Sequence, residues 1–585
     1  MNNVFTLAES LIKSAESSFK RGVFLIKGEN QEKYISYKDI YNKAVQVLYN
    51  LQACGLKPGD ELILQIKEDE NEQFIYTFWA CILGKIIPVP VSVTYKENRS
   101  KVLKIFSQLK SPKIIIDEKC LKSIDNYAKD TSFEKVFKCL KDNSISMEEV
   151  IKEEGIGVVQ DIKPEDIAFI QFSSGTTGDS KGVVLTHKNL LTNIVDIIKG
   201  FKGNDEDVTL SWMPLAHDMG IIGFHLMPLV LNVDQCLMPT TLFIRNPVLW
   251  IKKVNEHRAT IIAASNFGFR YFLDNLKDKE YPEWDLSCVR KVFNGAEPIS
   301  VDIINEFLNK LSRYNLKRVA MYPVYGMADA SLAVAFPPAD EEFSCVYVRR
   351  DSLGVGQDII ELKKDEDSEL VMELVVEGYS VRNCTIRIVD DNGNALDEGK
   401  LGHIQISGGN VTGEYYNNPE LTKKIIDKDG WLSTGDLGFI KNRRIVVIGR
   451  ATDIIRINGI TYYPHYIEKK CEKIEGIVSG RIVVCGLKDK VIEKEKLIIF
   501  LRFKKKIEDF LALAEDVKEI IKEQVGINVD EIIPIRSIPK TTSGKIQRFK
   551  LVEMYKKGEF NDIIDSISAI LSTKTLEEVS ATKDS

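Results

Sequence analysis

A run of small and hydroxyl-bearing residues between two apolar segments constrains the fold of this chain more than any other feature. The apolar segments 167–172 and 182–186 have the pattern of buried strands, and the run S-S-G-T-T-G occupies 173–178. Residues 187–201 follow as an amphipathic helix with Thr186 as a suitable N-cap, and its apolar face carries Leu190, Leu191, Ile194, Ile197, Ile198 and Phe201. The segment 167–201 therefore predicts a strand–loop–strand–helix unit.

The residue types of this loop are those that bind phosphate. Glycines permit tight turns that aim backbone N–H groups at one point, hydroxyls add donors, and a lysine adds positive charge. The loop is not a Walker A motif, because Ser180 stands where the second glycine would be. A flexible surface turn is the alternative, but such a run between two buried strands favours a phosphate site made by Ser173, Ser174, Gly175, Thr176, Thr177, Gly178 and Lys181.

The order of strand and helix patterns predicts two main domains. A chain of 585 residues exceeds one ordinary core. Alternating patterns continue to about 335 and predict α/β sheet subdomains, and from 345 the chain becomes strand-rich, with Asn392-Gly393 as a turn. We therefore expect an α/β fold, with a large domain over 1–450 that includes a small barrel-like part.

The composition changes near 450 and predicts a small, mobile α+β domain over 451–570. Two strands, RIVVCGL and KLIIFLRF, precede a helix over 507–525 that ends at Gly526. The inward face of this helix is expected to carry Phe510, Leu513, Ala514, Val517, Ile520, Ile521 and Val525. The polar residues 571–585 are expected to be a disordered tail.

Composition excludes several classes of function. The net charge of −6 shows no basic excess, so nucleic acid is not an expected partner. The 10 cysteines form no C-x-x-C pair and are expected to be reduced. The N-terminal residues lack the pattern of a signal peptide, and no apolar run is long enough to span a bilayer. We therefore expect a cytoplasmic protein.

Seven segments, in order, resemble motifs of the adenylate-forming superfamily, which includes acyl-CoA synthetases, peptide-synthetase adenylation domains and luciferases. The first is the loop at 173–190, and the others span nearly the rest of the chain. They read PLAHDMG (214–220), NGAEP (294–298), YGMADASL (325–332), WLSTGDLG (431–438), GRATDIIRINGITYYPHYIE (449–468) and PKTTSGKIQR (539–548). The resemblance implies that ATP and Mg²⁺ are used to convert a carboxylic acid into an acyl-adenylate and pyrophosphate.

The resemblance also implies roles for particular residues. Lys545 is the expected catalytic lysine between the acid and the α-phosphate, and His217 and Asp329 complete the catalytic set. Asp436 is expected to accept hydrogen bonds from the ribose, with Arg450 nearby. Asp329 and Thr176 are the expected Mg²⁺ ligands. The adenine and the reacting phosphate are framed by Gly295, Ala296, Glu297, Tyr325, Gly326 and Met327.

Two residues depart from the superfamily pattern. Asp329 stands where glutamate is usual, and this carboxylate is one methylene shorter, so the metal geometry is expected to shift or to use a water. Ser180 stands where proline is common, which is expected to loosen the loop modestly.

Within the superfamily, the chain looks most like the fatty acyl-AMP ligases that feed acyl carrier proteins in lipopeptide or polyketide synthesis. PLAHDMGIIG, FNGAEPIS and NGITYYPHYIE resemble their motifs, and 342–380 lies where these enzymes carry an insertion that hinders the use of free CoA. The small domain is expected to rotate near Thr452 between two half-reactions. No carrier domain is recognisable in the chain, so the expected acceptor is a separate phosphopantetheine-bearing carrier, or a carrier domain lost by truncation.

Three alternatives stay open. The first is an acyl-CoA synthetase. The second is an amino-acid adenylation domain, in which Asp218 lies near the position that pairs with a substrate ammonium. The third is an inactive nucleotide-binding scaffold. Lys181, Lys545 and Asp436 argue against the scaffold. The apolar run FHLMPLVL (224–231) is either the wall of a fatty-acid tunnel or a core helix.

Overall fold

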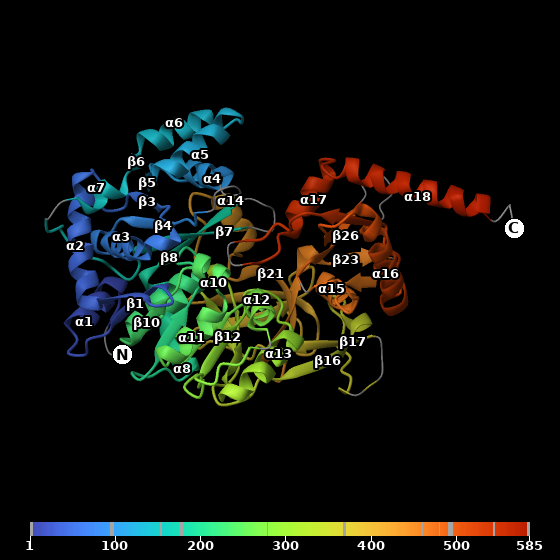
Figure 1. Ribbon diagram of the computed structural model, residues 1–585. Coiled ribbons are helices and arrows are strands. Elements are labelled where there is room, and N and C mark those ends of the chain that lie inside the picture. Colours follow the sequence, from blue (N-terminus) through green and yellow to red (C-terminus); the bar gives the residue numbers. More distant parts are fainter. Residues whose placement is uncertain are drawn as a thin grey trace.

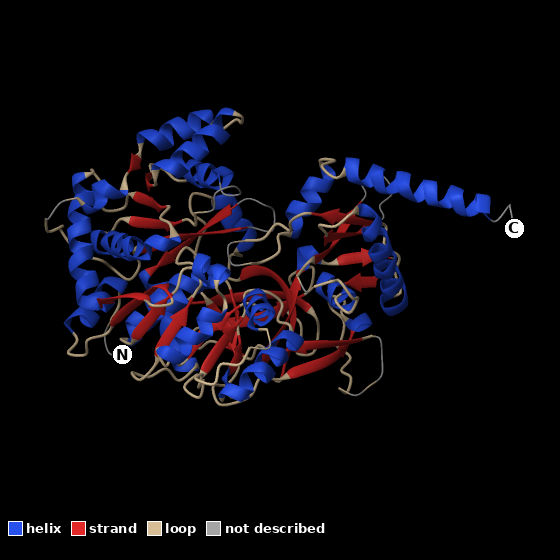
Figure 2. Cartoon of the chain, viewed as in Figure 1, coloured by secondary structure: helices blue, strands red, loops and turns tan. Residues whose placement is uncertain are grey.

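The computed structural model describes residues 4–93, 99–152, 155–174, 180–277, 279–364, 366, 370–457, 460–478, 480–488, 495–541 and 544–581. A large body of sheets and helices is joined to a smaller C-terminal part, which lies beside it (Figures 1 and 2). This arrangement confirms the predicted α/β class. In the described part of the chain, we find no helix with the length and apolar character needed to span a membrane.

The main sheet of the large body has seven strands, of which all but β2 run parallel. All four residues of β11 and of β12 are buried, so both faces of the sheet are covered. Its spatial order is β13 (Met321–Pro323), β12 (Lys291–Asn294), β11 (Ile261–Ala264), β9 (Val208–Ser211), β10 (Asp234–Leu237), β1 (Gly22–Gly28) and β2 (Gln31–Ser36). The helices from this part of the chain are α1 (Leu7–Glu16), α8 (His187–Gly200), α9 (Met227–Leu231), α10 (Thr240–Arg245), α11 (Val248–Glu256), α12 (Asn266–Leu276) and α13 (Val301–Leu311).

A second, parallel sheet of four strands lies in the N-terminal third of the chain. Its order is β4 (Ile87–Pro90), β3 (Glu61–Leu64), β5 (Lys113–Ile115) and β6 (Ser144–Ile145). The accompanying helices are α2 (Tyr37–Ala53), α3 (Asn71–Gly84), α4 (Arg99–Gln108), α5 (Glu118–Lys129), α6 (Glu134–Asp142) and α7 (Met147–Ile151).

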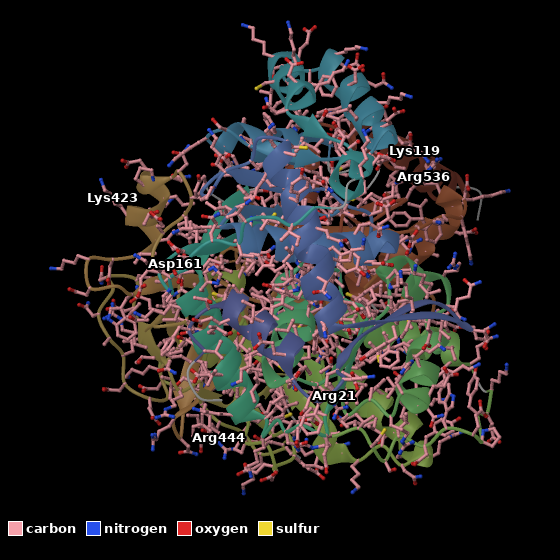
Figure 3. The ribbon with its side chains drawn as sticks, turned by 90° about the vertical axis from the view of Figure 1, so that its left-hand side faces the viewer. Arg21, Lys119, Asp161, Lys423, Arg444 and Arg536 are labelled. Atoms are coloured by element: carbon pink, nitrogen blue, oxygen red, sulfur yellow. The ribbon has the colours of Figure 1, made fainter. Side chains whose placement is uncertain are left out.

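The exposed charged side chains labelled in Figure 3, which include Lys119, Asp161, Lys423 and Arg536, carry both signs.

The predicted strand–loop–strand–helix unit is present. Strand β7 (Ile167–Ser174) pairs antiparallel with β8 (Ser180–Thr186), with Phe172 opposite Gly182. Helix α8 follows directly, and the Thr186 side chain accepts a hydrogen bond from the Asn189 N–H at 3.1 Å. The two strands of the hairpin therefore end at Ser174 and begin at Ser180, on either side of the predicted phosphate loop.

The strand-rich part consists of three small sheets. The largest is antiparallel, with order β19 (Cys384–Val389), β20 (Gly402–Gly408), β21 (Leu432–Lys441) and β22 (Arg444–Arg450). The other two are β14 (Tyr325–Gly326), β15 (Ala333–Phe336) and β18 (Tyr379–Ser380), and the hairpin of β16 (Cys345–Arg349) and β17 (Val371–Val375). The helix between β20 and β21 is α14 (Pro419–Ile425).

The C-terminal part has its own three-stranded sheet, packed with helices. The helix predicted over 507–525 is α16 (Ile507–Val525), and Gly526 ends it in the left-handed conformation with φ +76°. The other elements are β23 (Ile455–Ile457), β24 (Ile460–Tyr462), α15 (Pro464–Cys471), β25 (Ile482–Lys488), β26 (Glu495–Arg502), β27 (Glu531–Ile535), α17 (Arg548–Lys556) and α18 (Asn561–Ala581).

Helix α18 differs from the sequence prediction. Residues 571–581 were expected to belong to a disordered tail, but the helix continues through them to Ala581. It extends away from the C-terminal part in Figure 1. Its first half carries the partly buried isoleucines Ile563, Ile564 and Ile567, which pack onto the small domain. This packing stabilises the start of the helix, and the polar composition of residues 571–585 gave no sign of it.

The hairpin of β16 and β17 shares a hydrophobic core with the C-terminal part. Val348 and Leu374 belong to the same buried cluster as Tyr463 and Val517. Arg350, directly after β16, is 7% exposed, and its guanidinium carbon lies 5.1 Å from the ring centroids of both Tyr462 and Tyr466. The Arg350 Nη2 also donates to the Val525 carbonyl at 3.3 Å. The segment 342–380 therefore fastens the small domain to the large body.

We predict that Arg548→Ala destabilises the small domain. Arg548 of α17 contacts both Glu468 oxygens of α15 at 2.6 Å, and the Glu468 side chain is only 10% exposed. Removing one partner of a buried pair leaves the other charge unpaired, which typically costs about 3–5 kcal/mol. Chemical denaturation followed by a probe in the small domain measures the loss, and exposed Lys557→Ala serves as the control. A loss as small as that of the control would contradict the prediction.

Candidate active site

Three of the predicted motifs meet at the carboxyl edge of the main sheet. His217 and Asp218 follow β9, Gly295 and Ala296 follow β12, and Tyr325 follows β13. The chain crosses from β9 to β10 on one side and later to β11 on the other, so the carboxyl end of β9 is a topological switch point. Ligands of open α/β sheets bind at such points.

Two backbone features shape this edge. Ala296 has a φ of +79°, a strained conformation for a residue with a side chain. A Cβ at Gly326 would lie 2.1 Å from the Leu332 carbonyl oxygen, so only glycine fits there. The neighbouring Met327 N–H donates to that same oxygen at 2.8 Å. The turns after β12 and β13 are thus held in fixed, unusual shapes.

Lys545 of the small domain reaches this edge. It lines one cavity together with His217, Asp218, Ala296 and Tyr325. Burial lowers the pKa of Lys545, while the nearby Asp218 carboxylate opposes that change. Although burial favours the neutral acid, His217 and Lys545 lower the pKa of Asp218 to about 2. The mouth of the cavity therefore holds a cation from one domain beside an ionised carboxylate from the other.

The His217 ring is held by its neighbours. Its Nδ1 lies 2.6 Å from the Asp218 Oδ1, and the Met219 N–H donates to that carboxylate oxygen at 2.7 Å. Met219 opens the π-helical segment Met219–Leu226, a type of irregularity that is frequent at functional sites.

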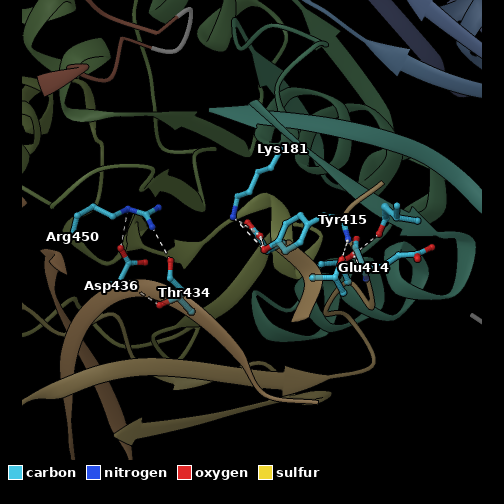
Figure 4. A network of polar contacts seen from close by, with 10 residues as sticks. Lys181, Glu414, Tyr415, Thr434, Asp436 and Arg450 are labelled. Carbon is cyan, nitrogen blue, oxygen red and sulfur yellow. Dashed lines mark hydrogen bonds and ion pairs between the residues drawn. The ribbon is translucent and has the colours of Figure 1, made fainter. Parts of the chain in front are cut away.

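Lys181 and Asp329 form an ion pair at the base of the loop hairpin. The Lys181 Nζ lies 2.8 Å from the Asp329 Oδ1 and 3.2 Å from the Tyr415 hydroxyl (Figure 4). The Tyr415 hydroxyl donates to that same carboxylate oxygen. Asp329 is buried, and both partners contact the same carboxylate oxygen. Sequence reasoning missed Tyr415, which lies in the segment before α14 and belongs to none of the seven motifs.

Asp436 and Arg450 form a second polar cluster across the site. The Arg450 Nε lies 3.0 Å from the Asp436 Oδ1, and its Nη1 donates to the Thr434 carbonyl at 2.8 Å (Figure 4). The Tyr325 hydroxyl donates to the other carboxylate oxygen at 2.7 Å. A carboxylate oxygen has two acceptor positions, so each still has capacity for a further hydroxyl.

The phosphate loop is described only at its two ends. Gly175, Thr176, Thr177 and Gly178, with the side chain of Ser174, lie outside the described residues. At the edge of the loop, the Ser173 Oγ is buried and has no hydrogen-bond partner in the part of the chain that the structure describes. Such an orphaned hydroxyl fits a site whose remaining partner is a ligand.

Glu297 lies under the small-domain loop. Burial raises the pKa of its carboxyl, and the Phe267 N–H opposes this by donating to Oε1 at 3.2 Å. The Lys540 Nζ lies 5.1 Å from the Phe267 ring centroid. Farther out, Lys469 of α15 pairs with Asp302 of α13 at 2.8 Å. The Lys540 and Lys469 contacts join the small domain to the large body in the position that brings Lys545 to the cavity.

The cavity behind Lys545 is mainly apolar. Sequence reasoning missed most of its wall, because α8, β12, β13 and β15 each contribute only one or two residues. The apolar and glycine lining consists of Ile197, Phe201, Met219, Gly223, Phe293, Tyr322, Val324, Leu332, Ala333 and Phe336. The run at 224–231 is not among them. Phe224, Leu226, Met227 and Leu229 are fully buried, so that run is a core segment rather than a tunnel wall.

Comparison with known proteins shows which enzyme family this chain is similar to. The AMP-binding enzyme family matches residues 14–416. A Caulobacter vibrioides protein that carries the provisional name acyl-CoA synthetase is 29% identical over 568 residues, which is 95% of this chain and 96% of the relative. A medium-chain-fatty-acid–[acyl-carrier-protein] ligase of Teredinibacter turnerae is 31% identical over 66% of this chain and 62% of the relative.

A solved structure from a study of fatty acyl-adenylate ligases of E. coli and L. pneumophila superposes with a TM-score of 0.85. It is 27% identical in sequence, and the match covers 95% of this chain and 99% of that one. The chain therefore belongs to the AMP-binding enzyme family. The resemblance that its motifs predicted is confirmed.

Proposed function

We propose that the protein activates a fatty acid with ATP, releasing pyrophosphate and forming an acyl-adenylate. The observation that carries the proposal is the cavity with an apolar wall and a charged mouth formed by Lys545, His217 and Asp218. An apolar wall stabilises an alkyl chain, and a cation at its mouth suits a carboxylate. The similarity to fatty acyl-adenylate ligases supports the same assignment.

The proposed reaction joins two anions. One carboxylate oxygen of the acid attacks the α-phosphorus of ATP, and the bond to the bridging oxygen of the β-phosphate breaks as pyrophosphate leaves. Lys545 lies between the two and offsets the charge that develops. Lys181 would hold phosphate oxygens, and Asp436, fixed by Arg450 and Tyr325, would accept hydrogen bonds from the ribose hydroxyls.

Mg²⁺ suits this donor set. It usually binds one or two carboxylates together with substrate phosphates, and Asp329 supplies one carboxylate. When bound, the ion would supply charge neutralisation at the phosphates. Thr176, the other expected ligand, lies outside the described residues. Asp329 already accepts from Lys181 and Tyr415, so nucleotide binding would exchange the Lys181 contact for one to phosphate.

The geometry argues against an amino-acid substrate. Asp218, the residue that would pair with an ammonium group, is engaged by His217 and the Met219 N–H and faces Lys545. The cavity beyond it offers mainly apolar side chains. A buried ammonium group would therefore have to compete with Lys545 for its carboxylate.

For the second half-reaction, we propose transfer to the phosphopantetheine thiol of a separate carrier protein. The similarity to a carrier-protein ligase supports this acceptor. The hairpin of β16 and β17 is packed into the core of the small domain, which would restrain the rotation expected near Thr452. The rival assignment is an acyl-CoA synthetase, the provisional name of the Caulobacter relative.

The test of this function is pyrophosphate release over a panel of acids. We expect a fatty acid to exceed every amino acid by at least about tenfold, because each buried methylene contributes about 0.8 kcal/mol. Asp218→Asn serves as a diagnostic variant, since loss of its charge would abolish an amino-acid reaction. A preference for an amino acid would overturn the substrate assignment, and no release with any acid would favour the inactive scaffold.

A further inference from the structure

We propose that the cavity ends in an aromatic floor that restricts the enzyme to acyl chains of medium length. The inference rests on the proposed function and adds the substrate class. Four of the aromatic side chains that line the cavity make up this floor: Phe201, Phe293, Tyr322 and Phe336.

Strand geometry gives the depth of the cavity. Tyr325 lies at the mouth, where its hydroxyl bonds Asp436, and Tyr322 lies three residues earlier in the chain, within β13. At about 3.3 Å per residue of extended chain, the two positions are at most about 10 Å apart. Phe293 of the neighbouring strand β12 pairs with Tyr322 and lies three residues before Ala296 in the chain. A chain entering past Lys545 therefore meets the floor after a medium length.

The floor is a packed cluster and not a set of separate rings. The ring centroids of Phe293 and Tyr322 are 5.5 Å apart, and those of Tyr322 and Phe336 are 5.7 Å apart. Phe201 meets Phe293 edge-on at 5.8 Å. The Tyr322 hydroxyl is turned away from the chain path, since it donates to the Pro337 carbonyl at 2.6 Å. Moving one ring requires moving its neighbours.

Phe336 is fixed by a glycine. A Cβ at Gly200, the last residue of α8, would lie 1.9 Å from the Phe336 Cε2, so the ring rests directly on the glycine backbone. Phe336 also lines the cavity, which is the open space beside the ring. Any side chain at position 200 would therefore push the ring toward the bound acyl chain.

A buried cation lies behind the floor. The Lys291 Nζ is 4.9 Å from the Tyr322 ring centroid and donates to the Ala339 carbonyl. Lys291 is 5% exposed, and burial lowers its pKa. A methyl terminus that passed the rings would meet this polar group, which adds a second reason for the chain to stop at Tyr322.

Substitutions on the two sides of the contact between Phe336 and Gly200 should change the chain-length preference in opposite directions. Phe336→Ala removes part of the floor and should shift activity toward longer acids. Gly200→Ala displaces the ring into the cavity and should shift it toward shorter ones. Buried methylenes change affinity by about fourfold each, so two additional or lost positions should change the long-to-short activity ratio about 15-fold.

The experiment measures pyrophosphate release with saturated acids of about six to eighteen carbons for the wild type and both variants. Phe137→Ala is the matched control, since Phe137 is buried to a similar degree in another core. We expect the rate of pyrophosphate release by the wild type to fall beyond medium chain lengths. The preferred chain length should increase in Phe336→Ala and decrease in Gly200→Ala. The short-acid rate and the thermal midpoint identify a variant that is merely unfolded.

Three results would contradict the proposal that the aromatic floor limits the acyl chain length. One is a wild type that uses the longest acids best, another is an unchanged chain-length profile in Phe336→Ala, and the third is a shift of equal size in Phe137→Ala. If Phe336→Ala does not fold, Phe336→Leu gives the same directional test with a smaller cavity change. Failure of the proposed function is distinct, because no acid of any length would then release pyrophosphate.

Discussion

Lys545→Ala is expected to lower the rate of acyl-adenylate formation by about 10²–10³ while ATP binding stays nearly unchanged. The expected size is that of losing one charge contact to a transition state. Lys545 reaches the cavity mouth from the small domain, beside Asp218 and Tyr325, where the acid and the α-phosphate would meet. ATP binding depends mainly on the large body, so the loss should appear in the rate.

The measurement is pyrophosphate exchange with a saturating fatty acid, together with a direct titration of ATP. Lys557→Ala, an exposed lysine of the same domain that pairs with Glu553, is the control. An unchanged exchange rate in Lys545→Ala would contradict the assignment. Since burial lowers the pKa of Lys545, the rate should also fall with rising pH at a lower pH than an ordinary lysine would give, as the ammonium loses its proton.

Arg350→Ala is expected to raise the formation of acyl-CoA by about tenfold and to leave acyl-adenylate formation unchanged. Coupling energies between distant sites typically correspond to about 5–150-fold. Arg350 anchors the hairpin segment between Tyr462 and Tyr466 of the small domain and bonds the Val525 carbonyl. Releasing this contact would free the small domain for the rotation that we propose for thiol transfer.

The assay supplies ATP, Mg²⁺ and a fatty acid with either CoA or a phosphopantetheinylated carrier protein. The intact enzyme should prefer the carrier. Arg349→Ala is the matched control, because the Arg349 side chain is half-exposed and forms its ion pair with the neighbouring Asp351. Deleting 342–380 is a poorer test, since it removes Val348 and Leu374 from the shared core. Efficient acyl-CoA formation by the intact enzyme would contradict carrier preference.

Local patterns predicted the elements whose signals are contained in one segment. The hairpin and helix at 167–200, with the Thr186 cap, follow from adjacent residues, as does the end of α16 at Gly526. The motifs also predicted Lys545 and His217 as catalytic residues, and the two side chains line one cavity. In these cases, the determining interactions lie within a few residues or within a known motif.

The wall of the cavity was not predictable in the same way. Phe336 and Gly200 are far apart in sequence, and their contact exists only because β15 packs on α8. The run at 224–231 had the stronger apolar signal but is simply buried. Periodicity reports that a residue is inside the protein, and it does not distinguish a filled core from the lining of a cavity.

Closure of the two domains depends on one position that tolerates a single residue type. Gly544, next to Lys545, has a φ of +89°, and a Cβ there would lie 2.6 Å from the Phe267 Cδ1. At this position the small domain therefore meets the large body through bare backbone against an aromatic ring. Random variation should spare position 544 as strictly as position 545, although glycine does no chemistry. The absence of a Cβ at position 544 is what allows the two parts to approach this closely.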